Sequence, residues 1–336
     1  MKKFLALCCS FVLAAGLSGC DASTTDDTAN RHVRVILDWT PNTNHTGIYV
    51  ALNKGYYEDA GLDVEVLGFS QAGVESVVEH GGAEFGFTGA ESLAIAYGQG
   101  ADLKMVYSLQ PLSSQGIAVR ADSDIHTPKD LDGKLFATYG GVQNTDKVKE
   151  MIRHDGGKGE FDTVVMGTAA YQAVADGSAD FAEGLSTWES IEFELKGSAL
   201  RFMYPWEWGV PGTPAVLGIS AKNDLIKNDP ELVKDFVSAT KKGYDYTLDH
   251  LDEASDILIA ENPDAQLNPE LVKRSHELLT TKFWPDATGR TGLADLQAWQ
   301  TFLDYLVAHG TILDANNQPR SAKLLAEDLV TNEFVK

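Results

Sequence analysis

Cysteine is almost missing from this sequence of 336 residues. Its three cysteines, Cys8, Cys9 and Cys20, all lie within the first twenty positions. The rest of the chain therefore has no disulfide, no thiolate nucleophile and no cysteine-ligated metal site. Its stability must come from hydrophobic burial, and roughly 300 residues are enough for one or two hydrophobic cores.

Positive charge is scarce as well, with 27 Lys and Arg against 49 Asp and Glu and a formal net charge of −22. Nucleic-acid binding depends on cationic contacts to phosphate, so this balance argues against a nucleic-acid partner. The sequence also lacks Gly-x-Ser-x-Gly, His-Glu-x-x-His and Walker-loop motifs. We therefore expect no catalytic residue, no metal site and no cofactor.

What is present begins with an export signal at residues 1–20. A short basic start precedes an apolar run, residues 4–17, which is too short for a permanent transmembrane helix. Leu17-Ser18-Gly19-Cys20 resembles a bacterial lipoprotein box, which implies cleavage before Cys20 and acylation of its sulfur. Residues 21–30 are polar and predict a tether. We expect a lipid anchor on the outer face of the cytoplasmic membrane, with an ordinary secretory signal as the alternative.

From residue 31 the chain alternates strand-like and helix-like stretches, which is typical of an α/β fold. After residue 222 helical patterns dominate, over about 229–248, 251–260, 268–280 and 293–309.

Two similar passages, residues 116–124 and 217–224, enclose a middle block of the chain. We expect both strands to cross between two lobes, so that residues 31–120 and 216–336 form lobe 1 and residues 121–215 form lobe 2. Two crossings make a hinge, and the cleft between the lobes can close around a ligand. The alternative is that both strands belong to one large sheet.

Four predicted strand-to-helix turns combine aromatic rings with polar side chains. In open α/β sheets such turns lie at the carboxyl ends of strands, where ligands bind. The candidate ligand-binding residues of these turns are Trp39, Asn42 and His45, then Gly89 and Glu91, then Tyr139, and finally Trp188 and Glu192.

These side chains suit a planar heterocycle with amino and ring-nitrogen groups. Each aromatic face adds about 0.5–1.5 kcal/mol of stacking, carboxylates accept from amino groups, and asparagine both donates and accepts. Structural alternatives remain for three of them. Glu91 could interact with the dipole of its own helix, Trp188 could be a core residue, and His45 could be hydrogen-bonded structure.

The run Leu37-Asp38-Trp39-Thr40-Pro41-Asn42-Thr43-Asn44-His45-Thr46-Gly47 resembles the first signature of the bacterial extracytoplasmic binding proteins for thiamine pyrimidine precursors. Lys54-Gly55-Tyr56-Tyr57 matches its continuation, and the resemblance covers roughly residues 31 to 310. It implies a two-lobed type II periplasmic-binding-protein fold and an ABC permease partner. It also implies an aminopyrimidine stacked on aromatic rings, with a carboxylate at the ring edge. We expect the protein to be a monomer.

The turn at Tyr139 departs from the family pattern. Relatives usually have Trp followed by Gly-Ser-Pro-x-Glu, whereas Tyr139 is followed by Gly140-Gly141-Val142-Gln143-Asn144. Another heterocycle such as riboflavin is therefore an alternative ligand. An enzyme is the second alternative, because the family includes a fungal hydroxymethylpyrimidine phosphate synthase with a functional His at the position of His45. Those enzymes also carry a cysteine cluster that this chain lacks, so we expect a binding protein.

Overall fold

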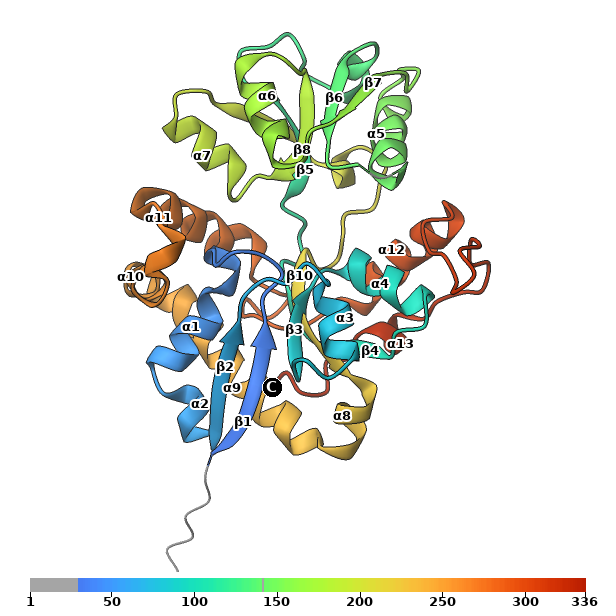
Figure 1. The fold of residues 1–336 in the computed structure, drawn as a ribbon. Coiled ribbons are helices and arrows are strands. Elements are labelled where there is room, and N and C mark those ends of the chain that lie inside the picture. Colours follow the sequence, from blue (N-terminus) through green and yellow to red (C-terminus); the bar gives the residue numbers. More distant parts are fainter. Residues whose placement is uncertain (1–29, 141) are drawn as a thin grey trace, which may run out of the picture.

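The computed structural model describes residues 30–336 except residue 141. The predicted signal, Cys20 and nearly all of the predicted tether lie outside these residues. The described chain forms two lobes, each built on a five-stranded sheet, and two chain segments join them (Figure 1). The prediction of an α/β fold with two sheets is confirmed.

Lobe 1 contains the first four strands and the last strand of the chain. The sheet order is β2-β1-β3-β10-β4, with β1, β2 and β3 parallel and β10 antiparallel to both of its neighbours. Helices cover both faces of the sheet, which explains why strands such as β3 are buried throughout. The strands are β1 (Arg31–Ile36), β2 (Leu62–Leu67), β3 (Phe85–Thr88), β4 (Leu103–Leu109) and β10 (Leu217–Lys222).

The helices of lobe 1 come from both ends of the described chain, and the four predicted helices after residue 222 are confirmed. The last of the four begins three residues later than predicted, at Leu296. The helices of lobe 1 are α1 (Thr46–Asn53), α2 (Tyr56–Asp59), α3 (Val74–Glu79), α4 (Ala90–Gly98), α8 (Asn223–Asn228), α9 (Pro230–Asp249), α10 (Leu251–Glu261), α11 (Pro269–Leu278), α12 (Leu296–Ala308) and α13 (Ala326–Leu329).

An aromatic stack joins the sheet of lobe 1 to α9. The ring of Phe236 lies 3.9 Å from that of Phe85 on β3 and 5.4 Å from that of Tyr57, measured between centroids. All three side chains are fully buried. The amphipathic α9 begins where Asp229 accepts a hydrogen bond from the backbone of Leu232, with Pro230 at its first position.

Helix α9 also fixes the start of α1. The two helices cross at Gly47 and Gly243, where a Cβ on Gly243 would lie 2.0 Å from the Gly47 carbonyl oxygen. Next to this crossing, the Tyr244 hydroxyl donates to the Asn44 carbonyl over 2.6 Å. The close approach therefore holds the loop that precedes α1 against the body of the lobe.

Lobe 2 repeats the strand order of lobe 1. Its sheet runs β7-β6-β8-β5-β9, with β6 parallel to β7 and β8, and with β5 antiparallel to both of its neighbours. Helices α5, α6 and α7 pack on it (Figure 1, upper lobe). Its elements are β5 (Gln115–Arg120), β6 (Leu135–Thr138), α5 (Val142–His154), β7 (Asp162–Val165), α6 (Ala170–Asp176), β8 (Phe181–Leu185), α7 (Glu189–Leu195) and β9 (Leu200–Met203).

The predicted lobe boundary at residue 120 is wrong for one strand. Both edges of β5 are paired within the second sheet, with β8 and β9, so residues 115–120 belong to lobe 2. The chain crosses between the lobes just before this strand, at residues 110–114, and returns at residues 204–216, just before β10. The crossings thus lie outside the strands, and the returning one includes a short 3₁₀ helix, Pro205–Glu207.

Side-chain hydrogen bonds connect the two crossings. Gln110 is buried and has a positive φ of 53°. Its Nε2 donates to Asn44 Oδ1 over 2.7 Å, and its Oε1 accepts from the Ser114 hydroxyl over 2.6 Å. From the returning segment, Trp206 Nε1 donates to the Ser113 carbonyl over 3.1 Å. The first crossing is therefore tied both to the loop before α1 and to the second crossing.

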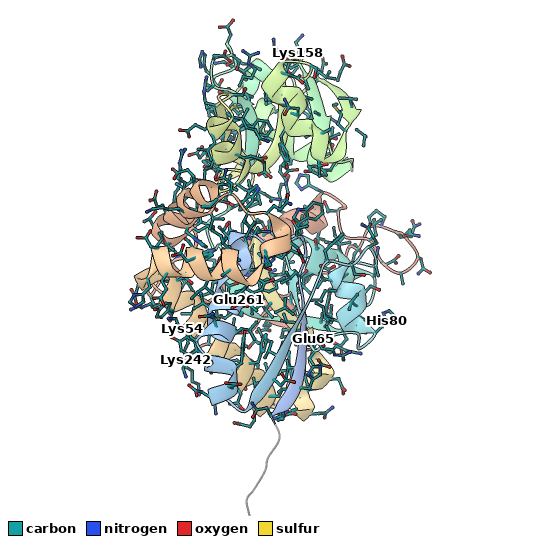
Figure 2. All side chains as sticks on the ribbon, turned by 60° about the vertical axis from the view of Figure 1, so that its left-hand side comes forward. Lys54, Glu65, His80, Lys158, Lys242 and Glu261 are labelled. Atoms are coloured by element: carbon teal, nitrogen blue, oxygen red, sulfur yellow. The ribbon has the colours of Figure 1, made fainter. Side chains whose placement is uncertain are left out.

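Further contacts bridge the lobes at two places away from the crossings. Arg274 on α11 pairs with Glu194 on α7 over 2.6 Å. On another face, Glu150 of α5 accepts from the Tyr305 hydroxyl and contacts His309 Nε2, each over 2.6 Å. Charged side chains cover the outer surfaces of both lobes, and Figure 2 shows exposed Glu65 on lobe 1 and exposed Lys158 on lobe 2. Within residues 30–336, no helix combines the length and apolar character needed to cross a membrane.

Candidate ligand-binding cleft

Two adjoining cavities lie between the lobes. The larger, of about 500 Å³, is lined by the aromatic rings of Trp39, Tyr139 and Trp188, and we call it the aromatic compartment. The smaller, of about 330 Å³, is lined by Glu91 and Glu183, and we call it the carboxylate compartment. The two share Tyr139, Tyr171 and Leu185 as a common wall.

The loop after β1 supplies the lobe 1 wall of the aromatic compartment. Trp39 is 48% exposed and packs against Phe69 with a centroid distance of 5.3 Å, so one side of its ring is free for a ligand. Asn42 shapes the loop: its Oδ1 accepts from the Asn44 N–H over 2.9 Å, and its Nδ2 donates to the Thr40 carbonyl over 3.0 Å. Asn44 of the same loop also lines the compartment.

His45 lies beneath this loop and lines neither compartment. It is fully buried, and its ring meets that of Phe87 edge-on at 4.9 Å. Nδ1 accepts from the Asn42 N–H over 3.2 Å, and Nε2 lies 2.8 Å from Asp38 Oδ1 as a donor. Both ring nitrogens are thus used within the loop. The prediction of direct ligand contact by His45 is wrong. The alternative, that His45 is a hydrogen-bonded structural residue, describes its position.

Lobe 2 supplies the opposite wall of the aromatic compartment. Tyr139 follows β6, is 46% exposed, and donates its hydroxyl to that of Tyr171 over 3.2 Å. Trp188, which immediately precedes α7, and Glu192, in the first turn of α7, both line the compartment. Glu192 also accepts from Lys196 over 2.6 Å. The altered turn after Tyr139 includes residue 141, which lies outside the described residues.

Glu189 and Tyr171 are wall residues that sequence reasoning missed. The Glu189 carboxylate accepts from the Leu185 N–H over 2.7 Å, and burial raises its pKa to about 7. Tyr171 lies in the first turn of α6, and burial raises its pKa well above the ordinary value. Their positions in the sequence could have indicated them, because Glu189 is next to Trp188 and Tyr171 follows the strand-to-helix turn after β7.

The carboxylate compartment lies between α4 of lobe 1 and β8 of lobe 2. Gly89 is part of this wall and leaves no room for a side chain, because a Cβ there would lie 2.9 Å from the Val216 carbonyl oxygen of the second crossing. Glu91 follows on the first turn of α4, and burial raises its pKa although nearby Lys147 opposes the shift. Lys147 itself pairs with Glu183 over 3.0 Å, and both side chains are largely buried.

Seven of the eight predicted residues therefore line the cleft, and contact with a ligand stays a prediction for each of them. Trp39, Asn42, Trp188 and Glu192 line the aromatic compartment, Gly89 and Glu91 the carboxylate compartment, and Tyr139 both. Among the described residues, no three His, Cys, Asp or Glu side chains are grouped closely enough to hold a metal ion.

Known structures share this fold. The alkanesulfonate-binding protein SsuA from Xanthomonas axonopodis pv. citri superposes with a TM-score of 0.64 at 16% identity, covering 89% of this chain and 98% of that protein. The periplasmic aliphatic sulphonate binding protein SsuA of Escherichia coli gives a TM-score of 0.64 at 15% identity, over 88% and 94% of the two chains. The two-lobed type II fold is confirmed, and identities this low carry nothing beyond the fold.

Relatives found by sequence have higher identity to this chain than these structures have. The chain is 28% identical to a formylaminopyrimidine-binding protein of Halalkalibacterium halodurans, over 87% of this chain and 90% of the relative. It is 26% identical to the riboflavin-binding protein RibY of Chloroflexus aurantiacus, over 91% and 86%.

An enzyme is also among the relatives. The 4-amino-5-hydroxymethyl-2-methylpyrimidine phosphate synthase THI13 of Saccharomyces cerevisiae is 26% identical over 64% of this chain and 67% of the enzyme. The family model described as NMT1/THI5 like matches residues 42–254. This match spans more than half of the chain and includes most of the residues that line the cleft. The chain therefore belongs to the NMT1/THI5-like family.

Proposed function

We propose that this protein is the extracytoplasmic substrate-binding component of an ABC importer and that it binds an aminopyrimidine precursor of thiamine between its lobes. One observation carries this proposal: partly exposed rings from both lobes, Trp39 on one side and Tyr139 and Trp188 on the other, line a single cavity of about 500 Å³. A flat ring held between these faces would join the lobes. The 28% identity to a formylaminopyrimidine-binding protein supports the choice of heterocycle.

The cavity edge offers polar groups that match an aminopyrimidine. Glu192 accepts hydrogen bonds from an exocyclic amino group. Glu189, with its pKa near 7, either accepts from an amino group or donates a proton toward a ring nitrogen. Charge-assisted hydrogen bonds contribute about 1.5–3 kcal/mol each. Together with stacking, they can reach the roughly 8 kcal/mol that micromolar affinity requires.

Binding without turnover fits the residues of the cleft better than catalysis. His45, the position of the functional His in the fungal enzymes, uses both ring nitrogens inside its own loop. No cysteine follows Cys20 in the sequence. Riboflavin binding is the second candidate, supported by the relative RibY and by Tyr139 in place of the usual Trp.

Calorimetry on the purified protein tests this function. We expect formylaminopyrimidine or hydroxymethylpyrimidine to bind with a dissociation constant of about 1 μM or lower, and riboflavin to bind at least about tenfold more weakly. The ligand recovered by chromatography should be chemically unchanged. Tighter binding of riboflavin would favour the second candidate, and a new pyrimidine product formed with a pyridoxal cofactor would favour the enzyme.

We further propose that Cys20 carries a lipid that anchors the protein to the outer face of the cytoplasmic membrane, beside its permease. The lipoprotein box and the polar residues 21–30 support this proposal. Cys20→Ser should move the protein from the membrane fraction to the soluble fraction, as followed by immunoblotting. Cys8→Ser is the matched control and should stay in the membrane fraction. Retention of the Cys20→Ser protein in membranes would contradict the lipid anchor.

A further inference from the structure

The carboxylate compartment contains one acidic side chain whose hydrogen-bonding capacity is unused. Among the described residues, Glu91 has no hydrogen-bond or ion-pair partner, although it lines the cavity and is partly buried. The other acids of the cleft are all engaged. Asp38 contacts His45, Glu183 pairs with Lys147, Glu189 accepts from the Leu185 N–H and Glu192 pairs with Lys196.

The charge balance around Glu91 is negative. Lys147 is the cation that faces it, and its ammonium is already 3.0 Å from Glu183. Two carboxylates and one ammonium leave one uncompensated negative charge in a partly desolvated cavity. Burial penalises the charged form of Glu91 and raises its pKa, while Lys147 opposes this shift and Glu183 adds to it. A bound cation or strong donor would remove this penalty, and an anion would increase it.

The two compartments are continuous along a shared wall. A ring in the aromatic compartment can extend a substituent past Tyr139, Tyr171 and Leu185, which line both cavities. The substituent would then lie between Glu91 of lobe 1 and Gln115 of lobe 2. It would contact both lobes, as the ring does, and so favour the closed form.

We propose that the carboxylate compartment is a second subsite that receives a positively charged substituent of the ligand, with Glu91 as the residue that sets this preference. This inference rests on the proposed binding of an aminopyrimidine in the aromatic compartment. It assigns the ligand to a chemical class: an aminopyrimidine that carries an amine or another cationic group on a side arm.

Matched ligand pairs test the subsite. The probes are 4-amino-2-methylpyrimidines whose 5-substituent is an aminoalkyl or a hydroxyalkyl chain of the same length, with one, two or three methylenes. The members of each pair are nearly equal in size, and the amine alone is charged at pH 7. For the length that reaches Glu91, calorimetry should show the amine binding at least about tenfold more tightly than its hydroxyl partner.

Glu91→Gln keeps the side-chain size and removes the charge, so it should reduce the amine-to-hydroxyl affinity ratio to within about threefold of unity. Circular dichroism of the variant, compared with the wild type, shows whether it is folded. The matched control is Glu65→Gln, the same change at an exposed site on lobe 1, and it should keep the full preference (Figure 2).

The outcomes separate the two proposals. Tight binding of hydroxyalkyl probes without any preference for the amine at any length would overturn the subsite and leave the proposed function standing. A preference that persists in Glu91→Gln would overturn the role of Glu91. Failure of every pyrimidine to bind the wild-type protein would overturn the proposed function and the subsite with it. If Glu91→Gln does not fold, the wild-type affinity ratio alone still decides whether the subsite prefers a cation.

Discussion

Trp39→Ala is expected to weaken aminopyrimidine binding by at least about tenfold, or about 1.4 kcal/mol. The Trp39 ring is half exposed on the cleft and is supported from behind by Phe69 at 5.3 Å. Its removal takes away a stacking face, about 0.5–1.5 kcal/mol, and the apolar area that a bound ring would cover. Calorimetry with hydroxymethylpyrimidine measures the loss directly.

Two variants make this result specific. Trp39→Phe keeps an aromatic face and should recover most of the affinity. Tyr97→Ala removes a ring from α4 of the same lobe that lines neither compartment, and it should leave affinity unchanged. Unaltered binding by Trp39→Ala would remove this residue from the site and shift the ligand toward the wall formed by Tyr139 and Trp188.

The largest loss of stability is expected for Phe236→Ala, at about 3–5 kcal/mol in the free energy of unfolding. Phe236 is fully buried between Phe85 at 3.9 Å and Tyr57 at 5.4 Å. Alanine would leave a cavity where the sheet of lobe 1 meets α9, and the fully buried neighbours have little freedom to fill it. Urea unfolding followed by circular dichroism should show a lower midpoint with an unchanged slope.

Leu296→Ala is the control for this effect, since that side chain is 45% exposed at the start of α12. It should cost less than about 0.5 kcal/mol, as surface substitutions usually do. A loss below about 1 kcal/mol for Phe236→Ala would mean that the surrounding helices collapse into the space, and that the aromatic stack is not a main support of lobe 1.

The sequence was informative where a local pattern decides the structure. Alternation of strands and helices predicts the α/β fold, and the position of polar turns after strands predicts which loops meet at the cleft. The lobe membership of β5 could not be predicted in the same way. Its residues Gly116 to Val119 are apolar and would suit either sheet, and pairing with β8 and β9 depends on residues more than sixty positions away.

The direction of side chains within a loop could not be predicted from the sequence either. His45 and Asn42 stand three positions apart in one loop, yet Asn42 lines the cavity and His45 lies buried against Phe87. A short 3₁₀ turn, η1 (Thr43–His45), sets this difference, and its geometry follows from hydrogen bonds that form only when the loop is folded. Glu189 was missed for a similar reason, because its burial is set by the surrounding lobe rather than by its neighbours in sequence.

The hydrogen bonds of Gln110 have a thermodynamic consequence. This single side chain contacts Asn44, which lines the aromatic compartment, and Ser114, which lies in the first crossing. We therefore expect ligand occupancy and lobe angle to be coupled, and linkage requires such a coupling to be reciprocal. If a ligand stabilises one lobe angle by a given free energy, a partner protein that holds the same angle changes the ligand's affinity by that same free energy.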